Sequence, residues 1–251
     1  AADGNIWLQQ NLGSQRVASS ITDHQAYGDL FQWGRWDDGH QRVVLNSGTH
    51  NGAPAAGSSI RFIGLPVPNS PEGLKSGAGV DTFYSSDNTV SPNPPHWWAT
   101  GQASNTWDAP TPEDVSVSRG CDPCRALGPG WRLPTLAEWT EVRNRERITN
   151  ITDAFGSSLK IPASGLRSGV NGEISDAGSG GMFWSSTTVT SDGSRARGYN
   201  FGAANAAAYD DRRSSGFALR CVKADGPVPD AYTYVAYAAE AVNGCQSVDT
   251  A

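Results

Sequence analysis

Residues with varied chemistry gather in one stretch near the end of the sequence. Positions 197–221 are RGYNFGAANAAAYDDRRSSGFALRC, which begins and ends like core β structure but is filled with small, polar and charged residues. Tyr, Asn, Asp and Arg are typical of binding faces, since they offer rigid aromatic area and several hydrogen-bond geometries. The candidate ligand-binding residues are Tyr199, Asn200, Asn205, Tyr209, Asp210, Asp211, Arg212 and Arg213.

A second candidate lies in PNPPHWW at positions 92–98, where Trp97 and Trp98 follow a proline-rich turn. Two interpretations are open. The tryptophans pin a loop to the body of the domain, or they form a stacking platform for sugar rings. Both uses suit a large aromatic ring with one polar atom.

Apart from its cysteines, the sequence has no pattern typical of a metal site or a catalytic site. No two of its histidines lie at metal-ligand spacing; they are His24, His40, His50 and His96. Asp37-Asp38 and Asp210-Asp211 offer carboxylates to calcium, but neither has EF-hand spacing, and solvated turns are favoured. We therefore expect no enzyme activity, no cofactor and no bound metal.

Charge argues against a nucleic-acid partner. The net charge is -6, whereas binding to a phosphate backbone needs a clustered basic face. Arg143, Arg145 and Arg147 alternate with Asn144 and Glu146, so they indicate a solvated helix face. No apolar run approaches the roughly 20 residues that cross a bilayer, so we expect no membrane insertion.

The four cysteines fit two disulfides formed in an oxidising compartment. Cys121 and Cys124 form CDPC, which is also the pattern of a redox pair or of half a zinc site. The chain has no second CxxC and no histidine pair to complete such a zinc site.

The elements that must position these residues are unevenly marked. Thr135 and Glu138 form a T-x-x-E capping box, which predicts a helix over 136–147 with Leu136, Trp139 and Val142 on its buried stripe. Segment 3–12 is typical of an opening strand or turn, and segment 151–190 is typical of short strands with tight connections. Between about 37 and 117 the sequence is irregular and rich in Gly, Pro, Ser and Asn, yet its tryptophans predict that it packs on the body of the domain.

Several motifs in order resemble the Fibrobacter-type major paralogous domain, which belongs to the C-type-lectin-like group with formylglycine-generating-enzyme-like domains. The motifs are GNIWLQQNL, YGDLFQWGRW, DPC followed by GPGWRLPTLAEW, LKIPASGLRSG, FWSSTTV and SSGFALRCVK. The resemblance covers residues 4–223, and the segment 37–117 matches nothing well. A second cysteine at 121 and a tail beyond LRCVK depart from the pattern.

The resemblance implies an α+β, C-type-lectin-like fold with short twisted antiparallel sheets, one or two helices and long loops. It implies a disulfide between Cys124 and Cys221, which leaves Cys121 and Cys245 as the second pair. It also implies strands at 197–201 and 217–222, with Phe201, Phe217 and Leu219 buried and the residues between them displayed. In some C-type-lectin-like proteins a retroelement that mutates adenines diversifies this region, and the residue types at 197–215 fit that spectrum.

We therefore expect one C-type-lectin-like domain at 1–223 with an insertion at about 37–117, and a tail at 224–251 docked by a disulfide. The chain begins with Ala1 and shows no leader, which fits a mature protein or a fragment of a longer one. The expected function is an extracellular, cell-surface or virion-surface module that binds a glycan or protein receptor.

Two alternatives to this function stay open. One is a structural subunit of a fibre, capsid or cell-surface filament, which would form homo-oligomers or join a larger assembly. The other is an oxidase of the formylglycine-generating type, with copper held by two cysteines.

Overall fold

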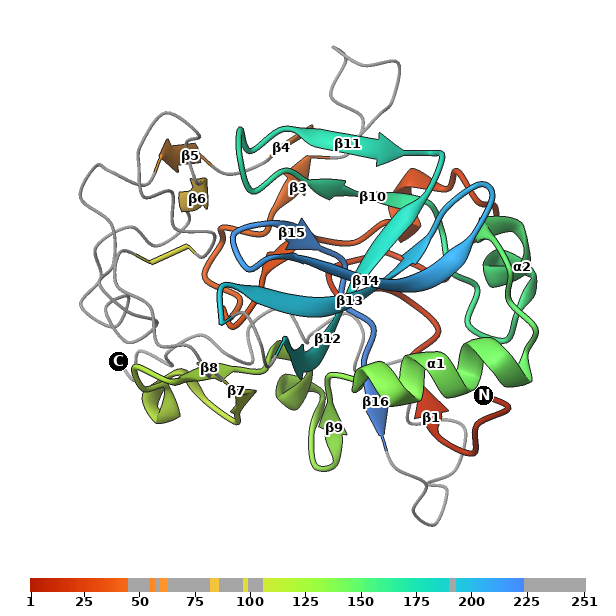
Figure 1. The fold of residues 1–251 in the computed structure, drawn as a ribbon, viewed down its shortest axis with the longest axis horizontal. Helices are drawn as coiled ribbons and strands as arrows, with labels where there is room; N and C mark the ends of the chain where they lie inside the picture. Colours follow the sequence, from red (N-terminus) through yellow and green to blue (C-terminus); the bar gives the residue numbers. More distant parts are fainter. Residues whose placement is uncertain are drawn as a thin grey trace.

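The computed structural model of the chain describes residues 1–44, 55–56, 59–62, 82–85, 97–98, 106–189 and 193–223. These residues form an α+β fold with many short strands and two α-helices, α1 (Leu136–Arg145) and α2 (Ile151–Gly156). Figure 1 shows the strands β12, β13 and β14 crossing the middle of the molecule, with α1 beneath them. The expected α+β class is therefore confirmed, with both helices in one part of the chain.

The largest sheet has seven strands, in the order β14-β13-β12-β10-β15-β2 with β11 paired to β10. Its strands are β2 (Phe31–Gln32), β10 (Ser164–Arg167), β11 (Ile174–Ala177), β12 (Gly181–Thr188), β13 (Arg195–Phe201), β14 (Ala206–Arg212) and β15 (Gly216–Phe217). β14 ends the order, so it is the edge strand on that side.

A second sheet joins the two ends of the domain. β16 (Val222–Lys223) pairs with both β1 (Ile6–Trp7) and β9 (Trp131–Arg132), antiparallel in each case. The expected single strand over 217–222 is wrong, because the chain changes sheets within it. Phe217 pairs with β2 in the large sheet, whereas Val222 pairs with β1 and β9.

Three further pairs of strands are small. They are β3 (Val43–Val44) with β4 (Ala55–Ala56), β5 (Ser59–Phe62) with β6 (Thr82–Ser85), and β7 (Thr106–Ala109) with β8 (Arg119–Cys121). The expectation of antiparallel sheets is wrong for β5–β6, β7–β8 and β10–β12, which pair in parallel. For β10 and β12 the reason is β11, which forms a hairpin with β10 and turns the chain before β12 begins.

Helix α1 begins at the expected capping box. The Thr135 hydroxyl accepts a hydrogen bond from the Glu138 amide at 3.2 Å, and the Glu138 carboxylate accepts one from the Thr135 amide at 2.8 Å. Arg132 holds the same carboxylate with two hydrogen bonds. Trp139 and Val142 are buried as predicted, and Leu136 is half-buried against the same core.

The helix ends at Arg145, two residues before the predicted end. Arg147 takes a φ of 56°, in the left-handed region, and the Ile148 amide donates back to the Arg143 carbonyl. This pattern is a Schellman motif. It places Ile148 in the core, where it is 0% exposed.

Helix α2 was not expected, since the sequence favoured strands from 151 onward. Asn150 caps it, because its side chain accepts a hydrogen bond from the Asp153 amide at 3.0 Å. Ile151 and Ala154 face the core. Six residues are too few to show helical periodicity, so the cap was the one available signal.

The large sheet carries a core on each face, since neighbouring residues of a strand point to opposite sides. On one face Phe183 packs against Trp139, with ring centroids 5.5 Å apart. On the other, Trp184 stacks on Phe217 at 4.0 Å. A third cluster of buried residues includes Trp36, Tyr84, Trp97 and Trp98, so the described parts of the 37–117 segment pack into the domain as expected.

Candidate functional site

The candidate surface is the hairpin of β13 and β14. Their register is continuous from Arg195 opposite Arg212 to Phe201 opposite Ala206. Residues 202–205 connect the strands, and the Gly202 amide donates to the Asn205 carbonyl at 2.8 Å. The predicted strand at 197–201 is thus confirmed and lengthened, and the residues after it form a second regular strand at the sheet edge (Figure 1).

Core residues pack against both faces of this hairpin. Tyr199 and Phe201 pack on the Trp139 ring, with centroids 6.2 Å and 5.6 Å from it. On the other face, a side-chain carbon at Gly198 would lie 2.7 Å from the Phe183 carbonyl oxygen. Only glycine fits there without moving backbone atoms, so the hairpin rests directly on β12.

Two hairpin residues of the predicted ligand-binding set are core residues. Tyr199 is 4% exposed and Arg213 is 0% exposed, so the expectation that they are displayed is wrong. Tyr199 alternates inward along β13, and burial raises the pKa of its phenol. The Arg213 guanidinium lies over the Trp33 ring, 4.5 Å from its centroid, and its Nε donates to the Arg195 carbonyl at 3.2 Å.

Trp97 and Trp98 are also buried, both at 0% exposure. Trp97 Nε1 donates a hydrogen bond to the Trp33 carbonyl at 2.8 Å. The rings of Trp97 and Trp98 meet edge to face, with centroids 5.0 Å apart. Of the two interpretations, pinning of the segment agrees with this burial. The stacking platform is wrong, because neither ring presents a face to solvent.

The remaining predicted residues stay at the surface of the hairpin. Tyr209 is 41% exposed and Asn205 is exposed at the connection between the strands. The partly exposed residues are Asn200, Asp210, Asp211 and Arg212. The hairpin therefore brings together six of the predicted residues, on a rigid support.

Ion pairs and burial set the electrostatics of this surface. Arg197, which the sequence analysis did not include, faces Asp210 across the strands with Nη1 and Oδ1 3.2 Å apart. Asp211 accepts a hydrogen bond from the Arg212 amide at 2.7 Å, and burial raises the pKa of its carboxyl. Burial also raises the pKa of the Tyr209 phenol, so its hydroxyl stays a hydrogen-bond donor at neutral pH.

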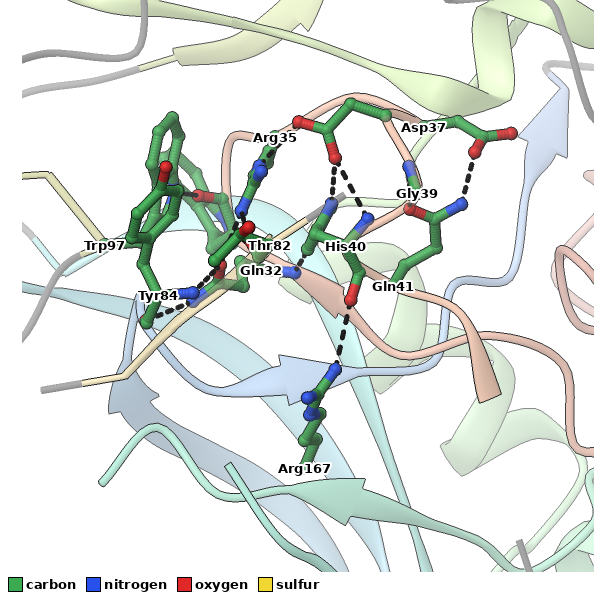
Figure 2. A network of polar contacts seen from close by, with 12 residues as sticks. Gln32, Arg35, Asp37, Gly39, His40, Gln41, Thr82, Tyr84, Trp97 and Arg167 are labelled. Carbon is green, nitrogen blue, oxygen red and sulfur yellow. Dashed lines mark hydrogen bonds and ion pairs between the residues drawn. The ribbon is translucent and has the colours of Figure 1, made fainter. Parts of the chain in front are cut away.

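A buried polar network lies behind β2, and the sequence analysis missed it (Figure 2). Asp38 lies between two partners: Arg35 Nε donates to its Oδ2 at 2.7 Å, and His40 Nδ1 lies 2.6 Å from its Oδ1. The Gln32 amide donates to His40 Nε2 at 2.9 Å. His40 is therefore neutral, with its proton on Nδ1, and both ring nitrogens are engaged.

Burial governs the ionisation of this network. It lowers the pKa of His40 to about 4, and it raises the pKa of the Asp37 carboxyl to about 6. Burial also opposes ionisation of Asp38, but Arg35 and His40 outweigh it and hold the pKa of that carboxyl below its ordinary value. Asp37 and Asp38 are 8% and 6% exposed, so the expectation of a solvated turn is wrong.

The network joins the 37–117 segment to the large sheet. The Arg35 guanidinium lies between the rings of Tyr84 and Trp97, at 5.1 Å and 5.3 Å. Arg167 of β10 donates to the His40 carbonyl at 3.1 Å and lies over the Phe83 ring at 3.9 Å. The network therefore connects segments of the fold. Its one signal in the sequence was a charged run, RWDDGH, directly after buried aromatic residues.

The cysteines follow the implied pairing where it can be seen. Cys124 is bonded to Cys221, which confirms that disulfide and removes Cys124 from any zinc site. Cys245 lies outside the described residues, so its pairing with Cys121 stays a prediction, as does the docking of the 224–251 tail. Within the part of the chain that the structure describes, no three side chains of His, Cys, Asp or Glu are grouped to hold a metal ion.

Comparison of the chain with protein-family models, with curated proteins and with solved structures found no match. Among the described residues, neither helix has the length and apolar character needed to span a membrane.

Proposed function

We propose that the protein is an extracellular, cell-surface or virion-surface binding module that presents the β13–β14 hairpin to a glycan or protein receptor. The observation that carries the proposal is the contrast between the buried and the exposed side chains of the hairpin. Tyr199 and Phe201 pack against Trp139, whereas Asn205, Tyr209 and Arg212 reach solvent. A rigid support with varied polar groups limits the entropy that binding must overcome.

The proposal includes a C-type-lectin-like fold. It is supported by the pairing of the first strand, β1, with the last described strand, β16, and by the disulfide between Cys124 and Cys221. That bond fits a protein made in an oxidising compartment. It also engages Cys221, which the oxidase alternative would need as a copper ligand, so the disulfide argues against that alternative.

Binding of the purified protein to a panel of cell surfaces and glycans tests the proposal. The variant to compare changes Asn205, Tyr209 and Arg212 to Ala. We expect the native protein to bind at least one surface or glycan and the folded variant to lose that binding. The matched control changes Glu141 and Arg145 to Ala, because these residues form an exposed pair on α1 and belong to neither strand of the hairpin.

The control variant should bind like the native protein. Equal binding by the native protein and the hairpin variant would contradict the proposal, and so would binding by neither.

A structural subunit is the second candidate, favoured by the position of β14 at the sheet edge. Ala207 and Ala208 are exposed there, and an uncharged stretch of an edge strand invites pairing with a strand of another chain. Light scattering tests this candidate. A stable oligomer of the native protein that a change of Ala207 and Ala208 to Lys dissociates would favour it, whereas a native monomer would count against it.

A further inference from the structure

The chain contains one acceptor sequence for an asparagine-linked glycan. The acceptor pattern is Asn, any residue except Pro, and then Ser or Thr. In the whole sequence it occurs once, at Asn150-Ile151-Thr152. These residues open α2, with Asn150 as its cap, and they belong to neither strand of the β13–β14 hairpin. The function proposed above therefore leaves this segment without a role.

The atom that would be modified lies at the protein surface. Asn150 is partly exposed, and Thr149 and Thr152 are exposed. Asn150 Nδ2 donates a hydrogen bond to the Thr149 hydroxyl at 3.2 Å, in a solvent-exposed position. The residues of this segment that face the core are Ile151 and Ala154. A sugar on Nδ2 would therefore extend from the surface without displacing core atoms.

The two polar atoms of the Asn150 side chain have separate tasks. Oδ1 accepts a hydrogen bond from the Asp153 amide at 3.0 Å and so caps α2. Nδ2 has two hydrogens, and its bond to Thr149 uses one of them. Attachment of a sugar replaces one hydrogen of Nδ2 and leaves Oδ1 untouched. The cap and the bond to Thr149 are thus compatible with a glycan.

The position of Asn150 in the chain also favours modification before folding. Asn150 lies between Cys124 and Cys221 in the sequence, so it enters a secretory compartment before their disulfide can close. Helix α2 has six residues, which are too few for a helix that is stable by itself, so it depends on packing against the core. The acceptor sequence is therefore available in an extended chain before Ile151 is buried.

We propose that Asn150 carries an asparagine-linked glycan. This inference rests on the secretion that the proposed function requires, and it adds a modification to that function. The donor is an oligosaccharide joined to a lipid through pyrophosphate. In the transfer, Nδ2 loses one hydrogen and forms a bond to the C1 atom of the first sugar, while the bond from C1 to the pyrophosphate oxygen breaks. The proton leaves with the lipid pyrophosphate, so no oxidant or reductant is needed.

The glycan would stand beside the proposed binding surface. The Ile151 amide donates a hydrogen bond to the Gly202 carbonyl at 2.9 Å, and Gly202 begins the connection between β13 and β14. Asn150 is the residue directly before Ile151. A sugar on it therefore borders the end of the hairpin that carries Asn205.

Mass spectrometry of the full-length protein secreted from cultured animal cells tests the proposal. We expect the intact mass to exceed that of the chain by one N-linked glycan. Peptide-N-glycosidase should remove this excess and leave aspartate at position 150, located by mass spectrometry of the peptides. A secreted protein with the mass of the bare chain, or with its glycan at another residue, would overturn the proposal.

Two changes of one residue supply the matched pair of variants. Thr152→Ala removes the hydroxyl that the acceptor sequence requires and leaves Asn150 in place, so the glycan should be lost. Thr152→Ser keeps a hydroxyl and should keep the glycan. Thr152 is exposed, so neither change should disturb the core. Equal glycosylation of the two variants would overturn the assignment to this acceptor sequence.

The melting temperature tests whether the glycan and the cap coexist. Removal of the glycan by the enzyme leaves Asp, which caps a helix as well as Asn does. The glycosylated and the treated proteins should therefore melt alike, whereas Asn150→Ala, which has no side-chain cap, should melt about 2–4 °C lower. A glycosylated protein that melts as low as Asn150→Ala would overturn the proposal, because the sugar would then have displaced the cap.

Failure of this inference and failure of the proposed function can be told apart. If the Asn205, Tyr209 and Arg212 variant loses receptor binding while the native protein carries no glycan, this inference fails and the proposed function stands. If the native protein carries the glycan but the hairpin variant binds as the native protein does, the proposed function fails and the modification of Asn150 stands.

Discussion

At the scale of single residues, the hairpin depends on Gly198. The strand β13 lies so close to β12 at this point that a Cβ atom would meet a backbone carbonyl and the edge of the Phe217 ring. Backbone atoms of a central strand cannot move aside cheaply. The proposed binding surface is thus tied to the core through a position that has no side chain.

We predict that Gly198→Ala lowers the free energy of unfolding by about 1–3 kcal/mol, the usual cost of overpacking. Gly156→Ala is the matched control, because a Cβ atom at Gly156 meets nothing within 4 Å. Urea unfolding measures both variants. Equal stability of the two would show that the close approach of β13 to β12 is not strained by a methyl group.

The second prediction at this scale concerns pH. The pKa of His40 is about 4 in the folded protein and ordinarily near 6.5, so the unfolded chain binds the extra proton between these values. Stability from this residue is complete above pH 6.5 and is lost as the pH falls towards 4. Asp37, whose pKa is raised to about 6, changes stability with pH in the opposite direction. The effect of His40 must therefore be measured as the difference between the native protein and a variant without this histidine.

We expect the native protein to lose about 2 kcal/mol more stability than His40→Gln between pH 6.5 and pH 4. Denaturant unfolding at several pH values supplies both curves. Parallel curves would mean that His40 is not held neutral by its surroundings.

At the scale of elements, local signals predicted some features and missed others for physical reasons. The start of α1 could be predicted because the side chains and backbone amides of Thr135 and Glu138 form hydrogen bonds with each other within four residues. The end of α1 could not be predicted, because the residue that takes the left-handed conformation there is Arg147 and not a glycine. Helix α2 was missed because its stability comes from the packing of Ile151 and Ala154 and not from a periodic pattern.

The hairpin shows the same limit. The resemblance implied that Phe201 lies in the core, as it does. Tyr199, which lies on the same face of β13, and Arg213 were predicted to be displayed but are buried. Their burial depends on partners far away in the chain, Trp139 and Trp33. Residue type alone therefore predicted where the candidate surface lies, but not which of its residues are exposed.

We predict that Thr135→Ala lowers the free energy of unfolding by about 1 kcal/mol, because the first turn of α1 loses its side-chain acceptor. Thr135→Ser keeps the hydroxyl and should cost much less. Chemical denaturation compares the two. An equal loss in both variants would assign the effect to the methyl group of Thr135 instead of to the cap.

At the scale of the whole molecule, a few long-range contacts hold many short elements together. The two α-helices hold 10 and 6 residues, and seven of the described strands hold only two, so tertiary contacts must supply the stability. The disulfide between Cys124 and Cys221 is the longest-range covalent contact among the described residues, with a sequence separation of 97. The buried network around Asp38 plays a similar part for the 37–117 segment.

We predict that changing Cys124 and Cys221 together to Ala lowers the free energy of unfolding by roughly 4–5 kcal/mol. Without the bond, the unfolded chain regains the conformational entropy that closing a loop of this length removes. Equilibrium unfolding under non-reducing conditions measures the loss. A loss below about 1 kcal/mol would show that the packing of the sheets alone holds the two segments together.

The central claim is that the exposed side chains of the β13–β14 hairpin form a recognition surface. Its most direct test is a titration of the first ligand found, with the native protein, the Asn205, Tyr209 and Arg212 variant, and the Glu141 and Arg145 variant. We predict that the hairpin changes weaken the affinity at least about tenfold, whereas the changes on α1 leave it within about twofold. Equal affinities for all three folded proteins, or a larger loss in the α1 variant, would contradict the claim.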